Sequence, residues 1–172
     1  LDLVFDTIGY LWVVGLDSDQ IHRFNVSNKS ETQFPFAGQF RSVAFFENNN
    51  ELYVAGDIGG TQQIWKFAID GSGNLDAGTL YFDFGSYYDG DINSMIFADN
   101  GELLIATSAE ESLIRLKPDG THATLYPGMI KEGAFGLTWR DDEIAIVTIT
   151  GDENSINFLD MFDRRRAGIF GF

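Results

Sequence analysis

The sequence predicts an all-β fold, a β-propeller of four four-stranded antiparallel blades, and three observations favour it. Apolar strands that begin at Leu11, Leu52, Leu103 and Ile144 stand in register at intervals of roughly 40 to 50 residues. Turn residues such as Asn100-Gly101 separate short strands within each interval. No long stretch shows a 3.6-residue apolar period, so we expect little helix. Four-stranded repeats of this length are typical of propeller blades.

Each repeat contains four short strands in a fixed order. The first is apolar and ends in an aromatic residue: Leu3–Phe5, Ser42–Phe46, Ser94–Phe97 and Gly136–Trp139. The second begins at the four positions named above. The third follows the pattern Ile/Leu-x-x-Phe/Leu: Ile21–Phe24, Ile64–Phe67, Leu113–Leu116 and Ile156–Leu159. The fourth varies more and lies near Thr32–Phe36, Thr79–Phe84, Ala123–Tyr126 and Ala167–Phe172. We therefore expect one domain over residues 1–172, with blades at about 1–38, 39–89, 90–131 and 132–172. A β-sandwich is the second choice, because it does not require fourfold internal similarity.

The blade count leaves the closure of the ring open. The sequence starts on a first strand and ends on a fourth, so no strand is left over to complete a blade shared by both termini. Three arrangements remain: a ring of four blades that closes on itself, two chains that pair into a larger ring through their end blades, or a piece of a longer chain that forms part of a larger ring. A homo-oligomer is thus one expectation.

Net charge disfavours two classes of partner. The chain carries a formal charge of −15, which repels a phosphate backbone and an anionic bilayer, so we expect no nucleic-acid partner and no membrane insertion. Cations, basic proteins and neutral glycans remain. Cysteine is absent, which excludes disulfides and thiolate sites. The start at Leu1 and the acceptor triplets at Asn25 and Asn28 indicate an extracellular or cell-surface protein.

Several phrases resemble the blades of a known superfamily. Ile64–Gly71 with Asn74–Asp83, and Asn100–Thr107 with Ile114–Gly120, resemble blades of gluconolactonase/regucalcin-like and NHL-type propellers. The order of strands and turns resembles that of these blades over nearly the whole chain. It implies a propeller fold and, for the gluconolactonase-like members, a divalent metal held by a Glu, an Asn and an Asp at the inner ends of blades.

The positions that match two of these ligands are altered in this chain. The phrase that would contain the Asn is Phe40–Ala44, where Arg41 takes its place. The phrase that would contain the Asp is Asn93-Ser94-Met95. A cationic side chain at this position is incompatible with the metal site of the family. A metal-dependent lactonase or related hydrolase is therefore kept only as an alternative function, and it would need altered metal ligands.

Carboxylates gather in the loops that a propeller would place on one face. This face carries the loops between second and third strands and those between blades, and its candidate binding residues are Asp17, Asp57, Asp89, Asp91, Glu110 and Asp152. Tyr87 and Tyr88, beside Asp89, could stack on a sugar or anchor a protein partner. The alternative is a solvated acidic rim and a tyrosine that packs against a neighbouring blade.

Two further patterns bear on metal binding and catalysis. Asp70–Asp76 alternates oxygen-bearing side chains, so a Ca²⁺ site with Asp70, Asn74 and Asp76 is an alternative to an ordinary hairpin turn. His22 and His122 match no triad or metal-ligand spacing, and structural or surface roles are expected.

These patterns favour a non-catalytic binding or assembly module that recognises a protein or glycan partner through its loop face, and no catalytic residue is predicted. A structural subunit of a stacked or homo-oligomeric extracellular assembly is a further alternative, in which the acidic end of one copy meets Arg164–Arg166 of another.

Overall fold

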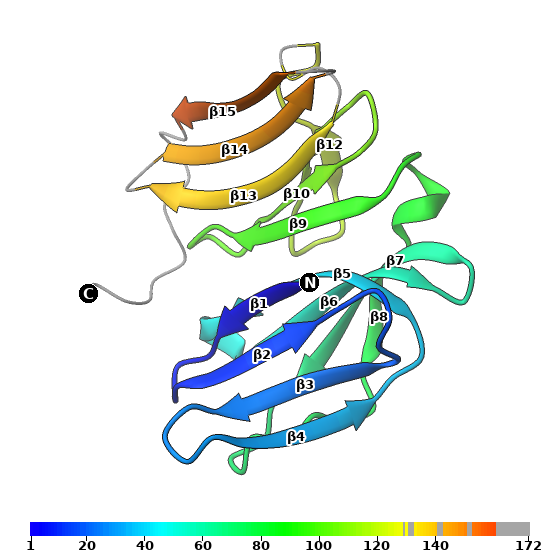
Figure 1. Cartoon of the computed structure of the whole chain (residues 1–172). Helices are drawn as coiled ribbons and strands as arrows, with labels where there is room; N and C mark the ends of the chain where they lie inside the picture. Colours follow the sequence, from blue (N-terminus) through cyan, green and yellow to red (C-terminus); the bar gives the residue numbers. More distant parts are fainter. Residues whose placement is uncertain (129, 131–132, 141–142, 151–152, 161–172) are drawn as a thin grey trace. The chain divides into compact units, whose positions relative to one another are not determined.

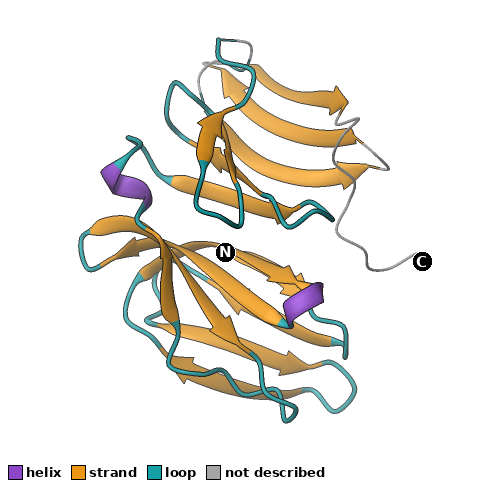
Figure 2. Cartoon of the chain, turned by 180° about the vertical axis from the view of Figure 1, so that it is seen from behind, coloured by secondary structure: helices purple, strands orange, loops and turns teal. Residues whose placement is uncertain are grey.

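The chain folds into two compact units, each built from two antiparallel sheets (Figures 1 and 2). The computed structural model describes residues 1–128, 130, 133–140, 143–150 and 153–160. One unit spans Leu1–Tyr87 and the other begins at Tyr88. The described residues contain strands and two short 3₁₀ helices, η1 (Glu47–Asn49) and η2 (Phe84–Ser86), and no helix among them has the length and apolarity to span a membrane.

The first unit contains two four-stranded sheets in simple meander order. The first sheet is β1 (Asp2–Phe5), β2 (Tyr10–Val14), β3 (Gln20–Asn25) and β4 (Ser30–Pro35). The second is β5 (Gln39–Phe46), β6 (Glu51–Ile58), β7 (Thr61–Ala68) and β8 (Thr79–Phe82). One face of the first sheet, with Trp12, Val14 and Ile21 fully buried, packs on the second sheet.

The second unit repeats the arrangement. Its first sheet is β9 (Ile92–Phe97), β10 (Leu103–Thr107), β11 (Leu113–Leu116) and β12 (His122–Thr124). Its second is β13 (Ala134–Arg140), β14 (Glu143–Thr150) and β15 (Glu153–Asp160). Every residue of β10 is buried, which explains why it reads as a continuous apolar run instead of an alternation.

The first strands of neighbouring sheets lie side by side, β1 with β5 and β9 with β13 (Figure 1). In both pairs, a backbone amide of the second sheet donates to a side-chain oxygen of the first. The Val43 amide donates to Asp2 Oδ2 at 3.0 Å, and the Leu137 amide donates to Ser94 Oγ at 3.2 Å. Asp2 and Ser94 hold equivalent places in their sheets, opposite Val14 and Ala106 respectively. Each unit is therefore the same pair of blades with a different residue at the accepting position.

A β-bulge interrupts three of the four first strands at the same place. The extra residue is Arg41 in β5, Asn93 in β9 and Phe135 in β13. Gly56 lies opposite the bulge of β5, and a Cβ there would stand 2.1 Å from the Gln39 carbonyl oxygen. A bulge turns its extra side chain out of the normal alternation, which is a common way to aim a residue at a site.

The fold-class prediction is confirmed: the described residues form a partial β-propeller with three four-stranded antiparallel sheets and a fourth sheet of three described strands, and each strand predicted before residue 161 is present. The fourth strand predicted at Ala167–Phe172 lies outside the described residues. Single-domain organisation and the mode of ring closure stay predictions.

Candidate functional site at the loop ends of the blades

In the first unit, the loop between β2 and β3 is joined to the connection between the two sheets. The Phe36 amide donates to the Asp19 carbonyl oxygen at 3.1 Å, and the Gly38 amide donates to Asp19 Oδ1 at 3.3 Å. These bonds place the loop around Asp17 beside the chain that enters β5. The first unit thus presents one continuous loop surface at this end.

The second unit has the same construction with different residues. The Asp91 amide donates to Ser108 Oγ at 2.8 Å, and the Ser108 amide returns a bond to the Asp91 carbonyl oxygen at 3.0 Å. Ser112, only 2% exposed, donates to the Ala109 carbonyl oxygen and accepts from the Gly133 amide, both at 3.0 Å. Hydroxyl groups therefore tie the inter-blade segments to the loop between β10 and β11.

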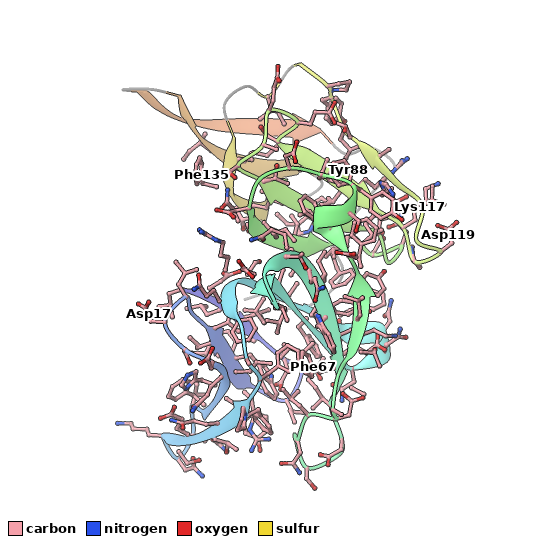
Figure 3. All side chains as sticks on the ribbon, turned by 90° about the vertical axis from the view of Figure 1, so that its right-hand side faces the viewer. Asp17, Phe67, Tyr88, Lys117, Asp119 and Phe135 are labelled. Carbon is pink, nitrogen blue, oxygen red and sulfur yellow. The ribbon has the colours of Figure 1, made fainter. Side chains whose placement is uncertain are left out.

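The predicted acidic residues differ in how freely they reach solvent. Asp17, Asp89 and Glu110 are exposed, and Figure 3 shows Asp17 at the edge of the first unit. Asp57 and Asp91 are half-buried, and Asp57 Oδ1 accepts from the Gly60 amide at 2.9 Å, which organises the turn between β6 and β7. Asp152 lies outside the described residues. Of the predicted acidic residues that the structure describes, Asp17, Asp89 and Glu110 are therefore the most exposed.

The two adjacent tyrosines have separate aromatic partners. Tyr87 ends the first unit, where it stacks on Phe82 with ring centroids 5.4 Å apart, and it is 61% exposed. Tyr88 begins the second unit, where its hydroxyl pairs with His122 Nδ1 at 2.7 Å. Burial, followed by the nearby charge of Glu111, raises the pKa of Tyr88 above its ordinary value. Tyr87 is thus the more exposed of the two tyrosines, and the hydroxyl of Tyr88 pairs with His122.

The carboxylates of Asp70 and Asp76 accept hydrogen bonds from amides within and beside the loop. Asp70 Oδ1 accepts from the amides of Ser72 and Asn74, both at 2.8 Å, and Asn74 Nδ2 donates to Asp70 Oδ2 at 3.2 Å. The amides of Asn74 and then Ser72 hold the pKa of Asp70 below its ordinary value. Asp76 Oδ1 accepts from the amides of Ala68 and Gly78. The geometry is that of a hairpin turn stabilised by Asx hydrogen bonds.

The described part of the chain holds no group of three or more His, Cys, Asp or Glu side chains arranged to bind a metal ion. The positions that the resemblance assigns to metal ligands are the bulge residues Arg41 and Asn93. Asn93 Nδ2 donates to the Ala134 carbonyl oxygen at 2.9 Å, which fixes its amide group. These residues do not fit the ligand set that the resemblance implies, because one is a cation and neither is a carboxylate.

A small apolar pocket of about 190 Å³ opens in the first unit between the end of β4 and the β7–β8 connection. Its lining includes Ile21, Phe34, Phe36, Phe67, Leu75 and Asp76. Phe67, marked in Figure 3, is 2% exposed and packs edge-on against Phe36. The volume lies below the roughly 300 Å³ typical of small-molecule sites, so it suits one side chain or a group of that size.

The first sheet also carries a chain of polar contacts that no sequence motif indicates. Ser18 Oγ lies 2.8 Å from His22 Nε2, and His22 Nδ1 lies 2.6 Å from Glu31 Oε1. His22 was assigned a structural or surface role because its spacing matches no motif. Pairing the predicted third and fourth strands would have brought His22 and Glu31 to one face, since His22 lies opposite Gln33 and side chains two apart share a face.

No family model and no curated protein matches the chain. Solved structures do. The first is a luciferin-regenerating enzyme, with a TM-score of 0.76 at 11% identity, covering 96% of this chain and 62% of that one. A gluconolactonase from Xanthomonas campestris gives 0.68 at 18% identity, covering 84% and 52%. Nidogen in complex with laminin gives 0.70 at 14% identity, covering 91% and 60%.

These identities are too low to transfer an activity, and the chain spans about half to three fifths of the length of the structures it matches. What the similarity carries is the fold. The chain is built from the blades of β-propellers, and its structural neighbours include members of the gluconolactonase/regucalcin-like superfamily and a nidogen-type propeller.

Proposed function

We propose that the chain is a binding module that recognises a basic protein segment or a neutral glycan through its acidic loop face. One observation carries the proposal: in each unit, hydrogen bonds join the β2–β3-type loop to the inter-blade segment, so Asp17 in one unit and Asp89 and Glu110 in the other stand on ordered surfaces. A net charge of −15 adds long-range attraction for cationic partners. The nidogen/laminin complex among the structural neighbours supports a protein-binding role.

The test compares two pairs of charge-neutralising substitutions. Asp17→Asn with Glu110→Gln removes two exposed charges from the loop ends, one in each unit. Glu47→Gln with Asp119→Asn removes two exposed charges from the opposite ends of the strands, again one in each unit. Binding of an octalysine peptide is measured by calorimetry at low salt. A larger loss of affinity in the first pair supports the proposal; equal losses would mean that only net charge matters and would refute a loop-face site.

The glycan form of the proposal depends on Tyr87, which is 61% exposed. Capture on a panel of neutral glycans should fall for Tyr87→Ala, because the stacking surface is lost. Tyr10→Ala, which removes an aromatic ring elsewhere in the first unit, is the control. Equal capture by wild type and Tyr87→Ala would exclude this residue as a stacking platform.

Assembly into a larger ring or stack is the second candidate, favoured by exposed apolar side chains on the end sheets. Leu3 is 53% and Phe5 44% exposed, on the face of the first sheet that points away from Trp12 and Val14. Ile156 is 62% exposed on β15. Light scattering should give a mass above 19.2 kDa that persists in high salt, because apolar contacts are not screened. A salt-sensitive assembly would instead favour charge-driven stacking through Arg164–Arg166, which lies outside the described residues.

A metal-dependent lactonase is the third candidate, supported by the gluconolactonase among the structural neighbours and opposed by Arg41 and Asn93. Ca²⁺, Mn²⁺ or Zn²⁺ should raise the melting temperature by mass action if a site exists. Gluconolactone hydrolysis is assayed on the same samples. Hydrolysis together with a metal-dependent shift would replace the binding proposal with this one.

A further inference from the structure

We propose that Ser18, His22 and Glu31 form a hydrolytic site for small, uncharged or cationic esters, in addition to any binding role of the loop face. The three groups occur in the order nucleophile, base and carboxylate. His22 uses Nε2 toward the serine and Nδ1 toward the carboxylate, at 2.8 and 2.6 Å. A nucleophile within hydrogen-bond reach of a base, which is itself oriented by a third group, is the arrangement that activates a hydroxyl.

The backbone holds the base and the carboxylate in place. His22 lies on β3 and faces Gln33 on β4, and Glu31 is two residues from Gln33 on the same face. Gln33 Nε2 donates to the same carboxylate oxygen, Glu31 Oε1, at 2.9 Å, which adds a second contact that holds this group. The His22 ring lies parallel to the Phe24 ring, with centroids 6.4 Å apart and 9° between planes. These neighbours restrict the imidazole to the orientation that reaches Ser18.

The contacts also determine where the protons lie. An ionised carboxylate can only accept, so the bond at Nδ1 is donated by His22 to Glu31. The hydrogen bonds of Gln33 and His22 keep the pKa of Glu31 below its ordinary value, which maintains the ionised form. In neutral imidazole Nε2 is then the acceptor, and Ser18 Oγ–H can donate to it. A second acceptor of the Ser18 hydroxyl, the Gln20 carbonyl oxygen, is farther away at 3.3 Å.

The site is open to a small substrate. The side chain of His22 is 22% exposed and that of Glu31 38%, and the neighbouring Leu16 is 40% exposed. The Asp19 N–H follows the nucleophile in the sequence and is the backbone donor that we assign to a developing oxyanion. Asp17 and Asp19 flank Ser18 and disfavour anionic substrates.

The reaction balances without a cofactor. Ser18 Oγ attacks the ester carbonyl carbon while its proton passes to His22 Nε2. The tetrahedral intermediate collapses, the carbon–oxygen bond to the alcohol breaks, and the alcohol leaves with that proton. Water then gives a proton to Nε2 and attacks the acyl–Ser18 carbonyl, and the bond to Ser18 Oγ breaks as the serine regains its proton. The products are one alcohol and one carboxylic acid.

The test uses p-nitrophenyl acetate as the uncharged ester, with the wild-type chain and Ser18→Ala, His22→Gln and Glu31→Gln. Ser27→Ala and His122→Gln are matched controls, since they remove an exposed serine and the second histidine. We expect Ser18→Ala and His22→Gln each to reduce kcat/KM at least about tenfold and the controls to leave it unchanged. Glu31 is a positioning residue, so Glu31→Gln should lower kcat more than it raises KM.

A covalent readout separates this mechanism from simple imidazole catalysis. A fluorophosphonate probe should add to Ser18, located by peptide mass spectrometry, and the adduct should be absent in His22→Gln. Circular dichroism of each variant verifies that the fold is intact. Hydrolysis that survives Ser18→Ala but not His22→Gln would overturn the nucleophilic role, and unlabelled Ser18 in the wild-type chain would overturn the proposal as a whole. Neither outcome affects the octalysine test of the loop face.

Discussion

Asp6 is a buried carboxylate on which the first hairpin depends. It is 1% exposed, and its Oδ2 accepts from the indole Nε1 of Trp12 at 2.9 Å, a side chain that is itself fully buried. Its Oδ1 accepts from the amides of Tyr10 at 2.9 Å and Ile8 at 3.1 Å. Replacing Asp6 with Ala would leave three donors without their acceptor, and one of them has no access to water.

The magnitude of this loss follows from the partners. A buried donor left without an acceptor costs about 1–3 kcal/mol, and hydrogen bonds to a charged group contribute roughly 1.5–3 kcal/mol each. The two amides lie at a part-buried turn where water can replace the carboxylate, so they add little. We expect Asp6→Ala to lower the free energy of unfolding by about 3 kcal/mol. For a chain of this size that corresponds to a fall in Tm of about 6–12 °C.

The assay is urea unfolding followed by far-ultraviolet circular dichroism, for Asp6→Ala, Trp12→Phe and the double variant. Trp12→Phe keeps an aromatic ring and removes the N–H, so the double-mutant cycle isolates the indole–carboxylate bond. We expect a coupling of about 1–2 kcal/mol, since the orphaned N–H is absent from the double variant. Additive effects, or a change below about 0.5 kcal/mol for Asp6→Ala, would refute this account of the hairpin.

Three other predictions follow from single contacts. Gly56→Ala should cost at least about 2 kcal/mol in urea unfolding because its Cβ meets the Gln39 carbonyl, whereas Gly59→Ala, also at positive φ but with open space around it, should cost about 1 kcal/mol. Arg23→Lys should lose stacking on Tyr10, 4.6 Å away, and the bond to the Gly73 carbonyl, so hydrogen exchange of the loop at residues 71–75 should accelerate. Because the pKa of Asp70 is lowered in the folded chain, its ionised carboxylate stabilises the fold at pH values above its ordinary pKa of 3.8, and this stabilisation is lost as the pH falls through the lower folded pKa. The difference in free energy of unfolding between wild type and Asp70→Asn should therefore shrink below pH 3.8. A difference that stays constant down to about pH 2 would contradict this.

The strands were predictable because each alternates or runs apolar between clear turn residues. For the third strands, prediction and structure agree closely. The predicted strand Leu113–Leu116 has the same bounds as β11, and the predicted strand Ile64–Phe67 lies within β7. Two of the fourth strands, β8 and β12, end earlier than expected for local backbone reasons. β8 ends at Phe82, before the 3₁₀ turn of Phe84–Ser86, and β12 ends at Thr124, two residues before Tyr126 takes a positive φ of 52°. The spacing of apolar residues indicates neither the 3₁₀ turn nor the positive φ of Tyr126.

Side-chain contacts between segments far apart in the sequence could not be predicted from the apolar pattern. Arg23 reaches the carbonyl of Gly73, and its guanidinium lies over the ring of Tyr10. The sequence shows only a lone arginine on a predicted strand, because the pairing of the blades decides what it meets. The contact between His22 and Glu31 is more predictable, because it follows from the register of two neighbouring strands. The contact between Ser18 and His22 is less so, because it depends on the path of the loop.

The repeat itself explains why fold could be predicted better than function. Equivalent positions keep the scaffold: Asp2 and Ser94 accept the same inter-blade amide, although one is a carboxylate and the other a hydroxyl. The bulge keeps its place in three strands, but the residue it presents changes from Arg41 to Asn93 to Phe135. Backbone geometry determines where the bulge lies, and the side chain at the bulge determines its chemistry. Structural similarity to another propeller therefore predicts the position of the bulge residue but not what that residue can bind. A lactonase interpretation of this chain therefore depends on Arg41, which is a cation, and on Asn93, whose amide donates to the Ala134 carbonyl oxygen, and neither supplies a carboxylate to a metal.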